Sequence, residues 1–212
     1  MNNVFYTCPL VCLLVGILLV WKLKYTRRSS IYARLAKDCG FQPVFDPTLH
    51  ANPDDFPELN VCTRCLRAMM DNFQVLIFEN DELKVEVGGP PETQTYVMIT
   101  HPSLNLPRFL MEPRSAALKM RTKIEMNKGM FFPKNELFTK NNFVDGPDRK
   151  AVSEAISPEF LALFRHNTSL TVEGRGSALL LYRLEVLASY KTILQRMDTA
   201  RSAVVALTTP RQ

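Results

Sequence analysis

Two cysteines separated by two residues, Cys62 and Cys65, are the strongest candidates for chemistry in this chain of 212 residues. Thiols at this spacing bind metals or exchange disulfides in many proteins. Zinc needs four ligands, so Cys39 and His50 would have to complete a set of three cysteines and one histidine, and their spacings match no common zinc finger. We therefore treat these four residues as weak metal candidates and expect no bound metal.

The alternative for the same pair is thiol redox chemistry. A thioredoxin-like pair would need an activated thiolate and a βαβ segment around it. Residues 61–70 (VCTRCLRAMM) instead predict an amphipathic helix that follows a proline-rich stretch at residues 43–60. The simplest interpretation is two cysteines on a partly buried helix, which stay reduced if the domain faces the cytoplasm.

Other catalytic signatures are missing from the sequence. The three histidines, His50, His101 and His166, fall in three different predicted segments. The sequence contains no nucleophile elbow, phosphate-binding loop, dinucleotide fingerprint or HExxH motif. We therefore expect no catalytic residue and no cofactor-binding residue, and we expect that the protein is not an enzyme.

The first 28 residues predict a membrane anchor. Residues 4–21 carry no charge, and four cations follow them: Lys22, Lys24, Arg27 and Arg28. A helix of that length measures about 27 Å, close to the thickness of the hydrocarbon core of a bilayer. Flanking cations stay on the cytoplasmic side, so the pattern predicts a single-pass helix in the lipid bilayer with the remaining chain in the cytoplasm.

Two other interpretations of this segment fit less well. A cleavable signal peptide would begin with positive charge and end in small residues, whereas this one begins with Met-Asn-Asn and ends in Trp-Lys-Leu-Lys. A lipoprotein would use Cys12, but much of the apolar run lies after it. Cys8 and Cys12 share one helix face, where small apolar side chains contact lipid.

The charge balance argues against nucleic acid as a partner. The chain carries 26 basic and 21 acidic residues, and the first 28 residues hold four of the cations, which leaves 22 cations against 21 acids. Residues 102–140 are basic and residues 41–101 are acidic, which predicts mutual neutralisation within one domain. The alternative is an anion- or lipid-binding patch that uses Lys119, Arg121, Lys123 and Lys128.

The elements that must position these residues indicate an α+β fold: an N-terminal transmembrane helix, then one mostly antiparallel sheet domain with a long C-terminal amphipathic helix. We expect the anchor at residues 1–28, a short helix and proline-rich linker at 29–60, and the α+β domain at 61–212. Gly40 is expected to end the short helix, and Ser157 to cap a helix that begins at Pro158. The predicted strands are residues 73–79, 83–87, 95–100, 108–111, 136–144, 169–173 and 178–183. The first two are expected to form a hairpin with residues 80–82 as its turn.

The C-terminal helix carries a regular apolar stripe. Its members recur at alternating spacings of four and three: Val186, Tyr190, Ile193, Met197, Ala200 and Val204. This stripe predicts a helix that packs its apolar face on the sheet. A coiled-coil homodimer through the same stripe is the alternative, although the stripe is shorter than the three to four heptads that such an assignment requires.

Short motifs across residues 70–205 resemble a group of uncharacterised bacterial membrane-anchored proteins. They are, in order, QT at 94–95, LPRF at 106–109, EPR at 112–114, VEG at 172–174 and LLLYR at 179–183. The resemblance implies a bacterial origin, an inner-membrane anchor and a small α+β domain without established activity. It implies no catalytic residues, and we expect the matched residues to be scaffold.

These observations predict a single-pass, membrane-anchored interaction or accessory subunit that is not catalytic and docks a partner protein or membrane complex at the cytoplasmic face. Two alternatives remain: a metal- or thiol-dependent redox protein that uses Cys62 and Cys65, and an anionic-lipid-binding domain.

Overall fold

The computed structural model describes residues 7–49, 56–82, 92–115, 129–183 and 187–209. By its internal contacts the chain divides into two compact units, Met1–Phe41 and Gln42–Gln212. The expected boundaries after residues 28 and 60 rested on charge and proline content, and they stay a prediction.

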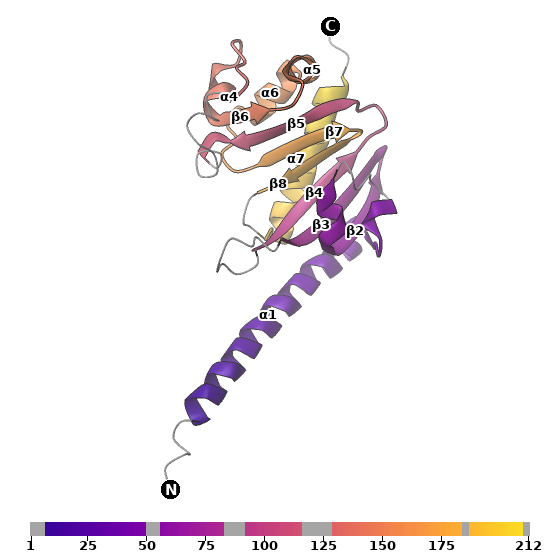
Figure 1. Cartoon of the computed structure of the whole chain (residues 1–212). Helices are drawn as coiled ribbons and strands as arrows, with labels where there is room; N and C mark the ends of the chain where they lie inside the picture. Colours follow the sequence, from indigo (N-terminus) through magenta and orange to yellow (C-terminus); the bar gives the residue numbers. More distant parts are fainter. Residues whose placement is uncertain (1–6, 50–55, 83–91, 116–128, 184–186, 210–212) are drawn as a thin grey trace. The chain divides into compact units, whose positions relative to one another are not determined.

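The first unit is built on one long helix, α1 (Thr7–Cys39), drawn in indigo to violet in Figure 1. The short helix expected at residues 29–39 is the final part of α1, because no proline or glycine interrupts the chain between Gly16 and Gly40. Its end was predicted correctly. Gly40 follows with a φ of 70°, and the Phe41 amide donates to the Leu35 carbonyl at 3.5 Å.

The transmembrane part of the predicted fold is not found. Within the described residues, no helix is both long enough and apolar enough to cross a membrane. The backbone of the predicted cationic flank belongs to α1, and the side chains of Lys22, Lys24 and Arg27 lie outside the described residues. The Arg28 guanidinium lies over the Tyr32 ring, 5.7 Å from its centroid.

The second unit contains one eight-stranded sheet in which every neighbouring pair is antiparallel. Across the sheet the order is β1-β2-β3-β4-β8-β7-β5-β6. The strands are β1 (Gln42–Pro43), β2 (Cys62–Met70), β3 (Phe73–Glu82), β4 (Glu92–Thr100), β5 (Leu106–Pro113), β6 (Asn142–Asp145), β7 (Thr171–Gly176) and β8 (Ala178–Tyr182). The predicted α+β class with one antiparallel sheet and a C-terminal helix is therefore confirmed.

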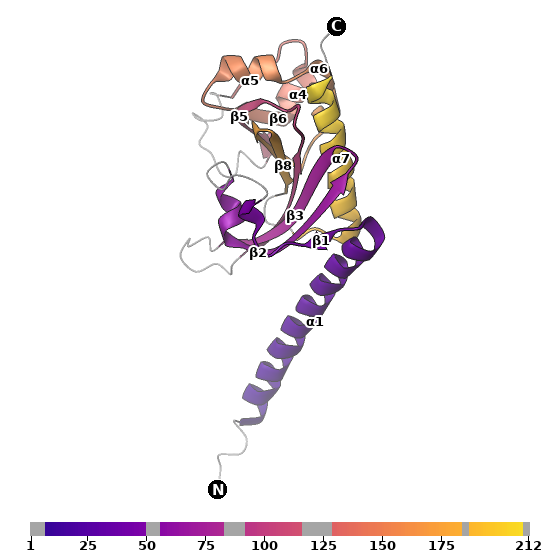
Figure 2. The same ribbon diagram turned by 90° about the vertical axis from the view of Figure 1, so that its right-hand side faces the viewer.

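Helix α7 covers one face of this sheet with α6 packed against it, while the short 3-10 helix η2 packs on the other face (Figure 2). We name these the helical face and the η2 face. The helices are α4 (Glu136–Asn141), α5 (Arg149–Ala155), α6 (Pro158–Phe164) and α7 (Tyr190–Thr208), and the 3-10 helices are η1 (Pro47–Leu49) and η2 (Pro57–Val61). Ser157 caps α6 by accepting from the Phe160 amide at 3.0 Å, as predicted.

The segment that carries the cysteine pair was predicted wrongly. Residues 62–70 form strand β2, which pairs with β3 along its whole length. The run of Leu, Arg, Ala and Met has good helix propensity, but long-range pairing between neighbouring strands overrides a weak local preference.

Two further strand predictions needed correction. Residues 136–144 divide into helix α4 and strand β6, because Asn142 ends the helix with its amide bonded to the Phe138 carbonyl. Residues 80–82, expected to be a turn, continue strand β3 and pair with residues 92–94 of β4. Residues 83–87, the other half of the expected hairpin, lie outside the described residues.

The C-terminal stripe packs on the sheet, as the amphipathic pattern indicated. Helix α7 contacts β4 and β8 and buries four stripe residues: Ile193, Met197, Ala200 and Val204. Within the chain this stripe already has a partner surface, so a homodimer through α7 would have to use the outer side of the helix. Val186 lies outside the described residues, and the dimer stays a prediction.

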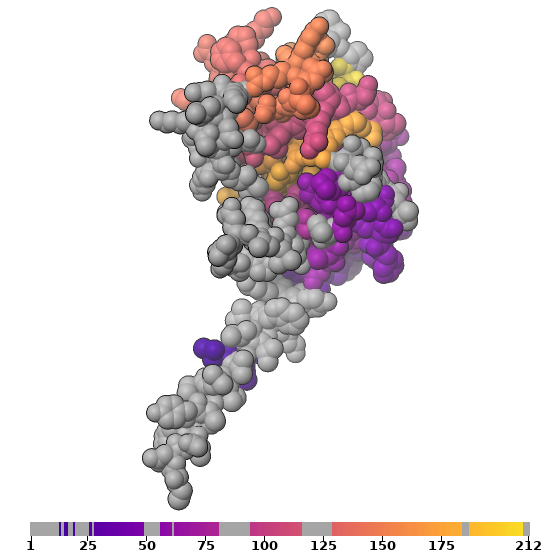
Figure 3. Space-filling model, in the orientation of Figure 1, coloured from indigo at the N-terminus to yellow at the C-terminus, as the bar shows by residue number. Residues whose placement is uncertain are grey.

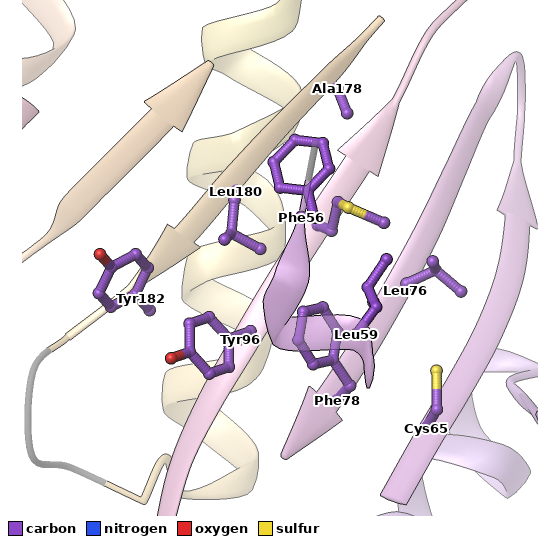
Figure 4. Packing of buried hydrophobic residues seen from close by; sticks show 10 residues of the cluster. Phe56, Leu59, Cys65, Leu76, Phe78, Tyr96, Ala178, Leu180 and Tyr182 are labelled. Atoms are coloured by element: carbon purple, nitrogen blue, oxygen red, sulfur yellow. The ribbon is translucent and has the colours of Figure 1, made fainter. Parts of the chain in front are cut away.

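A compact apolar cluster fills the η2 face (Figure 4). Phe56 and Leu59 lie over side chains from the central strands, among them Phe78, Tyr96 and Leu180. Strand alternation places these residues on one face and an equally buried set, including Val97 and Leu181, on the helical face. The central strands are therefore buried on both sides.

Candidate functional site

The structure separates the four weak metal candidates. Cys39 is the last residue of α1 in the first unit, and His50 lies outside the described residues. Cys62 and Cys65 both belong to β2. Over the described ranges, no three His, Cys, Asp or Glu residues come together in a way that could hold a metal ion. The cations proposed for anion binding, residues 119–128, also lie outside the described residues.

A β-bulge brings the two cysteines of β2 onto the same face of the sheet. Cys62 pairs with Asn80 and Arg64 with Glu79, so Thr63 is an extra residue without a counterpart on β3. Residues three apart on a regular strand point to opposite faces. The extra residue restores the alternation, and both thiols contact the apolar cluster of the η2 face.

A second polar feature of the η2 face centres on Glu173 of β7, and we call it the Glu173 cluster. Tyr182 donates its hydroxyl to one carboxylate oxygen at 2.7 Å, and Arg175 donates to the other at 2.7 Å. The Arg175 guanidinium also lies over the Phe56 ring, 5.1 Å from its centroid. The Glu173 and Arg175 side chains are each only 10% exposed, so this ion pair is largely shielded from water.

The hydrogen-bond network continues along β4. Tyr96 pairs with Tyr182 across the strands, with ring centroids 4.9 Å apart, and it donates its hydroxyl to Gln94 at 3.3 Å. Gln94 in turn donates to the carbonyl of Arg183 at 3.2 Å. Side-chain hydrogen bonds and one ring contact thus connect β4, β7 and β8 on this face of the sheet.

The environment of Tyr182 suits a hydrogen-bond donor better than a base. Burial raises the pKa of Tyr182 well above its usual value, and the negative charges of Glu173 and Glu112 raise it further. A general base needs a pKa near the working pH. The Glu173 cluster therefore acts as a fixed donor and ion-pair network.

This shift predicts how stability changes at alkaline pH. Replacing Tyr182 with phenylalanine should lower the free energy of unfolding by about 1 kcal/mol at neutral pH, the value of one hydrogen bond. In the unfolded chain a tyrosine loses its proton near pH 10. Since the folded pKa is higher, the stability that the hydroxyl provides is present below about pH 10 and falls above it. Urea unfolding of wild type and Tyr182→Phe should converge at high pH, and a constant difference would contradict the shift.

Sequence analysis did not single out these residues as a site. Glu173 and Tyr182 lie inside the VEG and LLLYR motifs that were expected to be scaffold. An acid within a predicted strand was the available signal, since a buried carboxylate needs a partner. The partner, Arg175, comes from the same strand, two residues further on.

A pocket of about 300 Å³ opens beside the Glu173 cluster, between β5, β7 and the residues that precede α5. Figure 3 shows α5 in orange above β5 in magenta on the side facing the viewer. The charged residues that line the pocket are Arg108, Asp145, Glu173 and Arg175. Asp145 pairs with Arg149 at 3.5 Å and Glu173 pairs with Arg175. Most of the lining charge is thus neutralised within the chain.

A larger and more open groove of about 580 Å³ lies between α6 and α7, on the outer side of α7. We call it the α6–α7 groove. Leu163 and Val205 line it, with 42% and 53% of their surface exposed. The described residues that line the groove are Phe73, Glu159, Leu163, Asp198, Arg201, Ser202, Val205, Ala206 and Thr209.

The charge of the groove is mainly acidic. Glu159 and Asp198 are among the residues that line it. Arg201, which also lines the groove, donates to Asp71 at 2.8 Å and lies over the Phe73 ring. Exposed apolar side chains surrounded by polar and charged ones are typical of a protein interaction surface.

Comparison with known proteins shows the fold and nothing finer. No family model and no curated protein matches the chain, so the resemblance to uncharacterised bacterial proteins stays a prediction. The chain is similar to the crystal structure of the mycobacterial trehalose monomycolate transport factor A, TtfA, with a TM-score of 0.52 and 13% identity. The likeness covers 88% of this chain and 97% of that one. The fold is therefore similar to that of TtfA over most of the chain, at an identity that shows the fold alone.

Proposed function

We propose that the chain is a membrane-anchored accessory subunit that is not itself catalytic and that docks a partner protein of a membrane transport complex at the cytoplasmic face. The observation that carries the proposal is the shared fold with a transport factor, which extends over 97% of that protein. The hydrogen bonds that connect Glu173 with Arg175 and Tyr182, and Tyr96 with Gln94, support a scaffold role for this part of the sheet.

The anchor in this proposal rests on sequence. Residues 4–21 are uncharged, and a helix of that length would extend over about 27 Å, close to the hydrocarbon core of about 30 Å. Four cations follow it: Lys22, Lys24, Arg27 and Arg28. Each such cation near an anionic leaflet contributes about 1 kcal/mol. We place the protein in a bacterial inner membrane as a single-pass protein.

For the docking surface we propose the α6–α7 groove, and for its occupant an amphipathic helix of the partner that carries Lys or Arg beside its apolar residues. Leu163 and Val205 offer apolar contacts on either side of the groove. Glu159 and Asp198 provide the complementary charge. Helices bind such grooves through apolar residues at three- and four-residue spacing, and charge complementarity selects the partner.

Cross-linking mass spectrometry on native membranes, with the tagged full chain as bait, tests both proposals. The expected result is one dominant protein partner whose cross-links map a basic amphipathic segment to α6 and α7. Leu163→Lys should reduce these cross-links at least tenfold, since about 1.4 kcal/mol of binding free energy corresponds to that factor. Leu137→Lys is the matched control, because Leu137 is 44% exposed on α4, away from the groove lining.

Each failure has a distinct meaning. Recovery of the chain alone would contradict the accessory role itself. A dominant partner would support the accessory role but contradict the groove as its docking site in either of two cases. In the first, Leu163→Lys leaves the cross-links unchanged; in the second, Leu137→Lys reduces them as much as Leu163→Lys does. Cross-links between two copies of this chain at α7 would replace the partner helix by a homodimer.

A further inference from the structure

The cysteine pair of β2 has an arrangement that the accessory role does not use. The bulge at Thr63 places Cys62 and Cys65 as neighbours on the η2 face. Cys65 is buried, with 6% of its surface exposed, whereas Cys62 is half-buried at the edge of the cluster. One thiol is thus accessible from outside and the other is held beneath it in the core.

The two thiols are directly connected. A side-chain hydrogen bond with Cys65 lowers the pKa of Cys62 by stabilising its thiolate. The same bond, together with burial, raises the pKa of Cys65. In the neutral pair, the Cys62 S–H donates to the Arg64 carbonyl oxygen at 3.2 Å, and the Cys65 S–H donates to the Leu66 carbonyl oxygen at 4.0 Å. The accessible sulfur is therefore the one more readily ionised, as in cysteines that react with oxidants.

We propose that Cys62 and Cys65 form an oxidation-sensitive dithiol in which Cys62 reacts with a hydroperoxide and Cys65 resolves the product into a disulfide. The Cys62 thiolate attacks one peroxide oxygen, the O–O bond breaks, and the departing oxygen takes up the proton that Cys62 has lost. Cys65 then attacks the sulfenic sulfur, the S–S bond forms and water leaves. Two thiols lose two electrons, and the hydroperoxide gains them.

The disulfide would enclose only two residues, Thr63 and Arg64. A loop that short restricts the unfolded chain little, so the bond would add little stability and could form and be reduced without unfolding the domain. Within the described residues the pair has no third metal-binding neighbour, so zinc, which requires four ligands, does not compete as an explanation there.

The test uses the purified full chain treated with hydrogen peroxide, in a Cys39→Ser background so that the third described thiol does not interfere. Trypsin cleaves after Arg64, between the two cysteines, so a disulfide joins two peptides that mass spectrometry otherwise finds separately. We expect the linked peptides after peroxide and their separation after a dithiol reductant. With Cys65→Ser added, we expect a sulfenic acid on Cys62 that dimedone traps.

Reaction with iodoacetamide provides an independent readout in the wild-type chain. Cys62 should be alkylated about tenfold faster than Cys39 at neutral pH, because alkylation requires the thiolate. Cys39 is the internal control, since it is also half-buried and belongs to α1 rather than to β2. Equal alkylation rates, or peroxide treatment that carries Cys62 to sulfinic acid in the presence of Cys65, would overturn the proposal.

Discussion

Replacing Glu173 with alanine is expected to lower the free energy of unfolding by about 3–5 kcal/mol, the cost of removing one partner from a buried ion pair. The substitution leaves Arg175 charged with only 10% of its side chain exposed, and it leaves the Tyr182 hydroxyl without its acceptor. Urea unfolding of the purified full chain, with the transition of the sheet domain followed by circular dichroism, measures the loss.

Two companion variants separate charge from hydrogen bonding. Glu173→Gln keeps an acceptor for Tyr182 but removes the charge opposite Arg175, so its cost should approach that of alanine. The combination of Glu173→Gln with Arg175→Met removes both charges and should recover most of the loss, because a buried ion pair contributes little beyond an apolar pair of similar size. A cost below about 1 kcal/mol for Glu173→Ala would show that the pair is solvated.

Replacing Gly174 with alanine is expected to destabilise the domain by about 3 kcal/mol, the upper part of the range for overpacking a core. A Cβ at this position would clash with the ring of Phe109, the residue paired with it across the strands. The direction of this change identifies the clash as its cause, since replacing glycine with alanine in a strand normally stabilises a protein by about 0.5–1 kcal/mol. Thermal or urea unfolding measures the change.

A double-mutant cycle connects this effect to its cause. The Phe109 ring packs edge-on against the Phe160 ring of α6, with the ring centroids 6.2 Å apart, so it has little room to move. Phe109→Leu alone should cost about 1–2 kcal/mol, and it should reduce the further cost of Gly174→Ala to less than half. Additive costs would mean that the alanine is accommodated elsewhere, contrary to the close approach between β5 and β7.

The Glu173 cluster and the close contact at Gly174 lie on opposite faces of the same strand. Glu173 points to the η2 face, where it contacts Tyr182, and Gly174 borders Phe109 on the helical face below α6. The acid and the glycine of the VEG motif thus both have structural roles. Glu173 accepts hydrogen bonds from Tyr182 and Arg175 on one face, and Gly174 leaves room for the Phe109 ring on the other.

The parts of the fold that could be predicted from sequence are those with strong local signals. Proline at 158 after serine at 157 marks the start of α6, because the capping hydroxyl and the fixed proline φ act within one turn. The stripe from Ile193 to Val204 marks the buried side of α7, because helical periodicity identifies the face that needs covering. Gly40 marks the end of α1 through its positive φ.

The predictions that failed lack such signals. Residues 62–70 have the composition of a helix, and they are a strand because β1 and β3 pair with them from both sides. Residues 80–82 have the composition of a turn, and they are a strand because β4 supplies partners up to Glu92. Pairing energy between distant segments decides such regions, and composition within ten residues does not contain it.

By itself, the sequence determined that one antiparallel α+β domain with a C-terminal helix follows an apolar, cation-flanked N-terminus, because composition and periodicity act locally. Only the tertiary structure decided that Cys62 and Cys65 are neighbours, since one bulged residue changes the face on which a thiol lies. The same holds for the partners of Glu173 and for the α6–α7 groove. Each depends on strand register or helix packing, which arises when distant segments meet.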